Sequence, residues 1–224
     1  MTPVTLLFPG QGSQYVGMGK QFLDKSTFKE VYERADEALG FSLSSLMLEG
    51  PDEKLALTQY TQPAIVTHSY AMFKQLEKDL KSNSLEVMQV LGHSVGEYSA
   101  LVAAGALKFE DAIKSVYLRG KYMQEATPEG VGSMYAILRA PSDVVAKACE
   151  NSSNEKEQVM CANFNDPTQI VISGHKNACE KAIEWLENNC EQRFMAKKLN
   201  VSAPFHCSLM KPAEDKLKMH LDSI

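Results

Sequence analysis

The chain has 224 residues, of which 44% are hydrophobic and 23% are charged. This is the composition of a folded globular protein, so a disordered or collagen-like chain is excluded. Its 23 basic and 28 acidic side chains leave a formal charge of −5, which gives no electrostatic reason to expect nucleic-acid or anionic-membrane binding. No apolar run approaches the roughly 20 residues of a membrane span, and the N-terminus lacks the basic flank of a signal peptide. We therefore expect a cytoplasmic protein.

The N-terminal half alternates short apolar runs with longer helical patterns. Residues 4–8 and 87–91 are predicted as buried strands, each followed by a glycine-containing loop. Apolar spacing predicts four helices, with Gly40 ending the first and Pro63 in the first turn of the second, over residues 28–39, 61–80, 95–104 and 111–126. This alternation favours an α/β core with parallel strands.

The segment from about residue 130 to residue 200 has a different pattern. Strands and helices are predicted there in the order β-α-β-β-α-β, over residues 133–138, 141–150, 159–163, 170–173, 176–189 and 194–199. This order is that of the ferredoxin-like arrangement. A unit of this kind inserted in an α/β domain would form one wall of a cleft, where ligands commonly bind. A last helix is predicted over residues 211–221.

A strand-to-helix turn is predicted at Gly92-His93-Ser94-Val95-Gly96. In this context the pattern Gly-x-Ser-x-Gly is typical of a nucleophile elbow, in which the glycines leave room for a sharp turn. The serine would then lie at a helix N-terminus, where the amide of Val95 and the helix dipole favour an oxyanion. The alternative is a purely structural turn, because small residues often collect at such positions.

A serine hydroxyl needs a base at neutral pH. His93 is adjacent to Ser94, but a neighbour on a tight turn usually points away from it. His206 lies in a proline-containing loop that returns to the core, and its spacing alone leaves a catalytic and a structural role open. The other histidines are interpreted as packing or surface residues, or have no evident role: His68, His175 and His220.

Two further positions are candidates for a site. The loop Gly10–Gln14 matches neither a Walker loop nor a dinucleotide-binding fingerprint, and it offers either a second oxyanion donor, such as Gln11, or a flexible turn. Arg119 lies in an otherwise apolar helical stretch, where it either extends to solvent or faces an anion. The residues alone favour a surface position for this arginine.

The cysteines suggest neither a metal site nor a disulfide framework. There are five of them and no CxxC pair, and a cytosolic chain of this kind is expected to keep its thiols reduced. The histidines add no ligand pattern. We therefore expect no metal. The cysteines are Cys149, Cys161, Cys179, Cys190 and Cys207.

Six ordered motifs give the sequence a family resemblance. They are PGQGSQ at 9–14, TQPA at 61–64, GHSVGE at 92–97, LRG at 118–120, NFNDPTQIVISG at 163–174 and APFH at 203–206. In this order they resemble the malonyl-CoA:acyl carrier protein transacylases and the acyltransferase domains of polyketide and fatty-acid synthases. The resemblance implies an α/β-hydrolase-like large domain of residues 1–129 and 201–224, with a ferredoxin-like subdomain of residues 130–200.

The resemblance also implies roles for individual residues. Ser94 would be the acylated nucleophile and His206 its general base and acid. Gln11 and Val95 would line the oxyanion hole. Arg119 would bind the free carboxylate of the malonyl group with both arms of its guanidinium.

Three more residues have weaker implied roles. Gln62 and Asn165 would help to shape the channel for the acyl group and the pantetheine arm. Phe205, before His206, is similar to the residue found in acyltransferases that accept malonyl and leave little room for an α-methyl branch.

The implied reaction is acyl transfer in two half-reactions. The malonyl group would pass from malonyl-CoA to Ser94 and then to the phosphopantetheine thiol of acyl carrier protein, which supplies fatty-acid chain elongation. CoA enters as part of a substrate, so no cofactor is expected. The implied partners are malonyl-CoA and acyl carrier protein, with no nucleic acid or membrane, and the protein is expected to be a monomer.

Members of this family usually extend further and have a later segment that orients the catalytic histidine. We therefore expect the C-terminal part of the large domain to be missing from this chain. Two alternatives stay open: a serine thioesterase or esterase, which passes the acyl group to water, and a non-catalytic fragment that binds acyl carrier protein.

Overall fold

The chain forms two compact units. The computed structural model describes residues 1–201 and 203–224, without the side chains at positions 78 and 81. The first unit contains Met1–Lys121 with His220–Ile224, and the second contains Tyr122–Met219. The division expected from sequence, with a subdomain of residues 130–200, stays a prediction.

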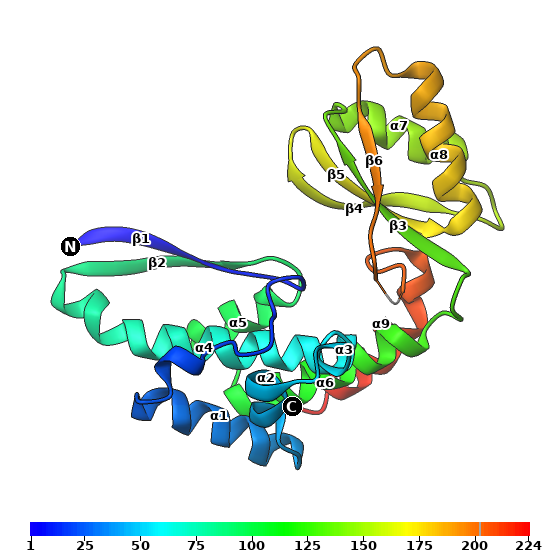
Figure 1. Cartoon of the computed structure of the whole chain (residues 1–224). Helices are drawn as coiled ribbons and strands as arrows, with labels where there is room; N and C mark the ends of the chain where they lie inside the picture. Colours follow the sequence, from blue (N-terminus) through cyan, green and yellow to red (C-terminus); the bar gives the residue numbers. More distant parts are fainter. Residues whose placement is uncertain (202) are drawn as a thin grey trace. The chain divides into compact units, whose positions relative to one another are not determined.

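A two-stranded parallel sheet and a layer of helices build the first unit (Figure 1). The strands are β1 (Thr2–Phe8) and β2 (Leu85–Gly92). The helices that begin in this unit are η1 (Lys20–Phe22), α1 (Ser26–Leu39), α2 (Leu43–Glu49), α3 (Asp52–Leu55), α4 (Thr58–Ser82), α5 (Gly96–Ala103) and α6 (Phe109–Glu125). Phe28, Leu43, Ile65 and Ile113 are fully buried, or nearly so, in the core between these helices.

Most predicted elements of the first unit are confirmed, with shifted ends. Helix α1 stops at Gly40, whose φ of 73° fits the expected left-handed C-cap. The prediction that Pro63 lies in the first turn of its helix is wrong, because α4 begins at Thr58 and Pro63 lies inside it. The short helices α2 and α3 were not predicted because one or two turns show no sustained apolar period. A side-chain cap starts α2, where Ser42 Oγ accepts from Ser45 N at 3.3 Å.

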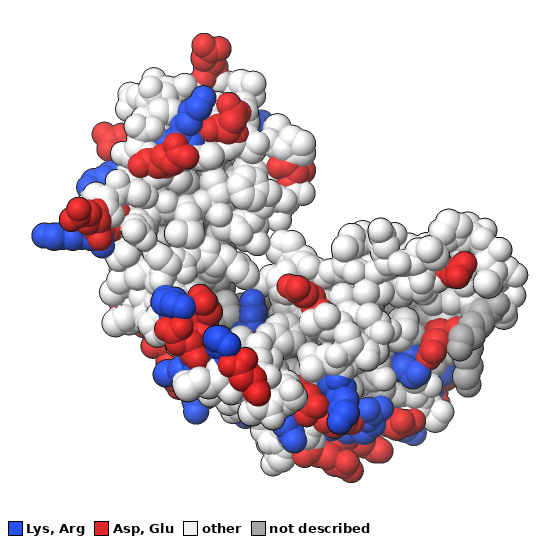
Figure 2. All heavy atoms as spheres, turned by 180° about the vertical axis from the view of Figure 1, so that it is seen from behind, with Lys and Arg blue, Asp and Glu red and all other residues white. Residues whose placement is uncertain are grey.

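The prediction that both strands are buried is wrong. Leu7 is 74% exposed, Met88 62% and Leu91 55%. A continuous apolar run predicts cover on both faces of a sheet, but α4 and α5 are the helices that pack on these strands. Over the part of the molecule that holds β1 and β2, Figure 2 shows a surface with few charged side chains. The apolar run thus identified the strands correctly and their burial incorrectly.

The second unit confirms the ferredoxin-like arrangement. Its four-stranded antiparallel sheet has the order β4-β5-β3-β6, with helices α7 and α8 packed on one face (Figure 1). The other face is covered around Phe205 and Met210. The elements are β3 (Gly132–Leu138), α7 (Ser142–Ser152), β4 (Val159–Asp166), β5 (Gln169–His175), α8 (Lys176–Asn189), β6 (Met195–Lys198), η2 (Ser208–Met210) and α9 (Lys211–Leu221).

The structure was also searched for membrane-spanning helices. Within the described ranges 1–201 and 203–224, no helix is long and apolar enough to cross a bilayer.

Candidate active site

Ser94 occupies a sharp turn between β2 and α5, as the Gly-x-Ser-x-Gly pattern predicts. Its φ of 51° is in the left-handed region, which a non-glycine residue adopts at some energetic cost and which often marks a functional position. The flanking glycines are required by close packing. A Cβ on Gly92 would lie 2.0 Å from the carbonyl carbon of Gly96, and one on Gly96 would lie 2.4 Å from Phe8 O. The turn therefore tolerates only glycine at these two places.

Arg119 and Gln62 lie beside this serine. Nη1 of Arg119 donates to Oε1 of the buried Gln62 at 2.8 Å, and Nη2 is 3.4 Å from Ser94 Oγ. Gly120 makes this approach possible, because a Cβ there would lie 2.5 Å from the carbonyl oxygen of Thr58. Helix α6 thus packs directly on the start of α4, and Arg119 does not extend to solvent.

The electrostatic setting of Arg119 favours an anionic ligand. Burial lowers the pKa of its guanidinium, while Tyr98 and Glu97 act in the opposite direction. An arginine stays protonated in proteins even so. A half-buried cation gains more from an incoming carboxylate than an exposed one would, since the local dielectric is low.

The loop after β1 lies against the serine turn. His93 N donates to Phe8 O at 3.0 Å, and a Cβ on Gly10 would lie 2.6 Å from His93 O and 2.7 Å from its Nδ1. The half-buried Gln11 follows Gly10 directly. Val95 is buried and lies at the N-cap of α5, and the next amides, of Gly96 and Glu97, donate to the carbonyls of His93 and Ser94. The shared role of Gln11 and Val95 as oxyanion donors stays a prediction.

His206 belongs to the second unit. Its φ is 56°, and it lines a hollow of about 540 Å³ together with residues of β4, η2 and α9: Met160, Cys207, Ser208, Met210, Lys211 and Glu214. Asn165 is exposed near the end of β4. Because Ser94 and His206 lie in different units, their pairing remains a prediction, as does the channel role of Asn165.

The sequence patterns missed two features of these surroundings. The first is the hydrogen bond between Arg119 and Gln62, which joins residues 57 positions apart on different helices. Gln62 had been expected only to shape the acyl channel. The second is the position of Met160, which lines the same hollow as His206 but has no pattern in the sequence that would indicate this. Only the packing of separate elements brings these side chains together, so no spacing rule could have found them.

The other histidines take structural positions. His68 Nδ1 is 3.0 Å from the hydroxyl of Tyr32, and burial lowers the pKa of the imidazole. His220 Nε2 is 3.0 Å from Ser115 Oγ. In the described part of the chain, no three His, Cys, Asp or Glu side chains gather as a metal site would require.

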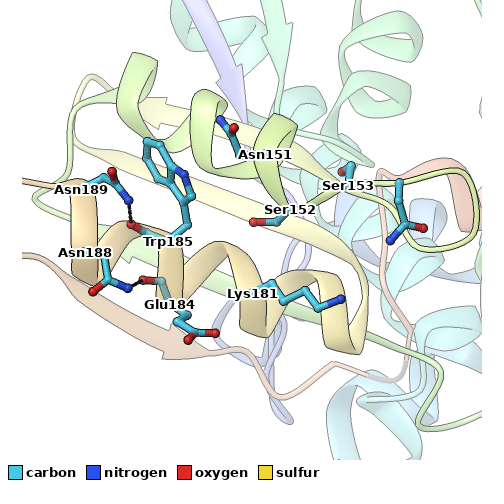
Figure 3. Close-up of a pocket in the computed structure, with 9 residues that line it drawn as sticks. Asn151, Ser152, Ser153, Lys181, Glu184, Trp185, Asn188 and Asn189 are labelled. Atoms are coloured by element: carbon cyan, nitrogen blue, oxygen red, sulfur yellow. Dashed lines mark hydrogen bonds between the residues drawn. The ribbon is translucent and has the colours of Figure 1, made fainter.

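The second unit has another hollow, which is not part of the predicted site. Figure 3 shows it between α7 and α8, with Trp185 at one side. Its lining holds none of the predicted site residues. It consists of Asn151, Ser152, Ser153, Asn154, Lys181, Glu184, Trp185, Asn188 and Asn189.

Comparison with known proteins identifies the family. Residues 5–224 match the acyl transferase domain. The chain is 46% identical over 224 residues to the malonyl CoA-acyl carrier protein transacylase of Bacillus subtilis, covering all of this chain and 69% of that protein. It is 44% identical over 225 residues to the Escherichia coli K12 protein of the same name, again over all of this chain and over 71% of the relative.

Solved structures agree with this result. The transacylase of Clostridium perfringens is 45% identical with a TM-score of 0.91, over 100% of this chain and 68% of that one. A type II PKS acyl-carrier protein in complex with its malonyl-transacylase gives 39% identity and a TM-score of 0.90, over 100% and 71%. The comparisons give no support to an esterase or to a non-catalytic module. The chain therefore belongs to the acyl transferase domain family, among its malonyl CoA-acyl carrier protein transacylases.

Proposed function

We propose that this protein transfers the malonyl group of malonyl-CoA to the phosphopantetheine thiol of acyl carrier protein through an ester on Ser94. The observation that carries the substrate assignment is the position of Arg119 Nη2, 3.4 Å from Ser94 Oγ. In a malonyl thioester one methylene group separates the carboxylate from the reacting carbonyl. A carboxylate held by Arg119 would therefore bring that carbonyl next to the serine oxygen.

His206 is the proposed general base. It would take the proton of Ser94 as the hydroxyl attacks the thioester, and return it to the departing CoA thiolate. The amide of Val95 and a group of the Gln11 loop would stabilise the oxyanion of each tetrahedral intermediate, an effect worth about 3 kcal/mol per donor. The thiol of the carrier protein then attacks the ester in the reverse sequence, and Ser94 is regenerated.

The proposal has further parts. Malonyl-CoA and acyl carrier protein are the proposed partners, the protein acts as a cytoplasmic monomer, and the CoA thioester is consumed as a substrate, with no additional cofactor. Asn165 would line the path of the pantetheine arm, and Gln62 would act on the acyl site through Arg119.

Covalent labelling tests the nucleophile. The full-length protein is mixed with malonyl-CoA, quenched in acid and digested, and the peptides are analysed by mass spectrometry. We expect a malonyl ester on the peptide that contains Ser94, and none in the Ser94→Ala variant. Ser99→Ala, one helical turn further along α5, is the matched control and should label as the wild type does. Labelling at another residue in the wild type would contradict the proposal.

A second experiment separates the two candidate bases. We expect His206→Ala to lower the rate of malonyl transfer by at least about 10³-fold, because the serine loses its proton acceptor. His93→Ala should have a much smaller effect, since the ring of His93 lies against Gly10. If His93→Ala caused the larger loss, the assignment of the base would be wrong. Stopped assays of malonyl-carrier-protein formation provide the measurement.

A further inference from the structure

Two cysteine side chains of the second unit contact each other. Sγ of Cys149, on α7, is 4.0 Å from Sγ of Cys161, on β4. Both side chains pack in the core cluster between the helices and the sheet. Across the described residues 1–201 and 203–224, this is the one pair of thiols within hydrogen-bond distance of each other.

The backbone around this pair is held in place. Ser153 Oγ donates to Cys149 O at 2.8 Å and accepts from Val159 N at 3.0 Å. These bonds join the end of α7 to the start of β4, on which the two cysteines lie. The sulfur atoms are 4.0 Å apart, so side-chain rotation has to bring them about 2 Å closer to reach the S–S bond length of about 2.0 Å.

We propose that Cys149 and Cys161 are a redox-sensitive dithiol that hydrogen peroxide converts to an intramolecular disulfide. The thiolate of Cys161 attacks one peroxide oxygen, the O–O bond breaks, and water leaves after protonation. The resulting sulfenic acid is attacked by the sulfur of Cys149, which forms the S–S bond and releases a second water. Two thiols and one peroxide thus give one disulfide and two waters, and a dithiol reductant reverses the change.

The order of the two steps follows from exposure and hydrogen bonding. Cys161 is half-buried, whereas Cys149 is buried, so peroxide reaches Cys161 first. The hydrogen bond from the Cys149 thiol lowers the pKa of Cys161, and the same contact together with burial raises the pKa of Cys149. The thiolate is the reactive form of cysteine. Cys161 is therefore the residue that peroxide oxidises first, and Cys149 is the resolving one.

The remaining cysteines provide the comparison. Cys179 and Cys207 are buried, and Cys190 is half-buried like Cys161. Cys190 at the end of α8 therefore resembles Cys161 in exposure and differs from it by lacking a thiol at contact distance. Exposure alone would make both residues react alike, whereas the proposed site predicts a disulfide only at Cys161.

Mass spectrometry of the folded full-length protein tests the proposal. The protein is treated with increasing hydrogen peroxide, the remaining thiols are blocked with an alkylating reagent, and the digest is analysed without reduction. We expect a peptide pair linked through Cys149 and Cys161, with the loss of two hydrogen atoms, as the main oxidised product. Dithiothreitol should restore both thiols. Cys161→Ser and Cys149→Ser should abolish the linked pair, and Cys190→Ser, the matched control, should retain it.

Three outcomes would overturn the proposal. Cys161 could stop at the sulfenic or sulfinic acid while Cys149 stays open to alkylation. The disulfide could join Cys161 to Cys190, or the pair could stay reduced at peroxide levels that oxidise Cys190. The wild-type protein alone distinguishes these outcomes, so the test holds even if a serine variant does not fold. Protein unfolded in urea before oxidation should give mixed pairings, which shows that the native contact directs the bond.

Discussion

The guanidinium of Arg119 joins two elements that are distant in the sequence: it donates to Gln62 Oε1 at 2.8 Å and reaches to 3.4 Å from Ser94 Oγ. Gln62 lies in α4 and is buried, so its amide fixes the plane of the guanidinium. The direction of the remaining N–H donors is thereby set beside Ser94. Under the proposed function, this cluster of the first unit would bind the carboxylate of the substrate and hold the serine that is acylated.

Removing the guanidinium should change the choice of substrate. We expect Arg119→Ala to lower kcat/KM for malonyl-CoA by about 10²- to 10³-fold, because truncating one partner of a half-buried charge pair typically costs about 3–4 kcal/mol. Acetyl-CoA has no carboxylate, so its transfer should change little. Parallel assays with both thioesters give the ratio.

The variant Arg119→Lys is the matched control for charge. A lysine keeps the positive charge but loses the planar fork, so it should recover only part of the malonyl activity. If Arg119→Ala lowered malonyl and acetyl transfer equally, the arginine would have a structural role and no part in substrate recognition.

Gln62, the hydrogen-bond partner of Arg119, should affect the binding of malonyl-CoA more than its turnover. We expect Gln62→Leu to raise KM for malonyl-CoA by roughly fivefold, since a lost hydrogen bond of this kind costs about 1 kcal/mol. The rate constant kcat should fall less. Gln62→Glu should raise KM further, because its carboxylate would compete with the substrate for the guanidinium. Steady-state kinetics separate the two parameters, and an unchanged KM in both variants would contradict the positioning role.

The tight serine turn should make Gly92, one of its two required glycines, irreplaceable. We expect Gly92→Ala to destabilise the fold by at least about 3 kcal/mol, because the added carbon would lie 2.0 Å from the backbone of Gly96. Gly130→Ala is the control. Gly130 has a φ of +84° and nothing within 4 Å of an added Cβ, so only the conformational cost of about 1 kcal/mol applies. Urea unfolding measures both values, and equal losses would contradict the steric argument.

The half-buried His68 should make the free energy of unfolding depend on pH. Its folded pKa is lowered by burial, so the unfolded chain binds more protons between the folded and the unfolded pKa. Stability therefore rises with pH through that window and is lost as pH falls below about 6.5, the usual histidine value. We expect His68→Gln to lose less free energy of unfolding than the wild type between about pH 7.5 and about pH 5.5. A variant with the wild-type pH slope would show that another group is responsible.

Much of the fold could be predicted from the sequence because its signals are local. The 3.6-residue period found α1, α6 and α8, and glycines marked their limits or the turn at Ser94. The β-α-β-β-α-β order of the second unit was likewise readable from short apolar runs and turn residues. These patterns depend on backbone geometry within about ten residues, so they can be recognised in the sequence alone.

The ordered motifs of the sequence similarly predicted the family, to which the chain belongs. They named Ser94, His206 and Arg119 as candidates. Residue types alone left Arg119 at the surface, and its half-buried position beside Ser94 became visible only once α6 was packed on α4.

Tertiary structure decided every relationship between separate elements. An apolar run specifies a strand but not the number of its covered faces, so Leu7 and Met88 were expected to be buried and are exposed. The contacts of Arg119 with Gln62, and of Cys149 with Cys161, depend on how helices and sheets pack. Local propensity has no influence on side-chain distances across elements, because those are set by the crossing of whole helices and strands. The sequence by itself thus determined the elements and the candidate chemistry, and packing determined which side chains meet.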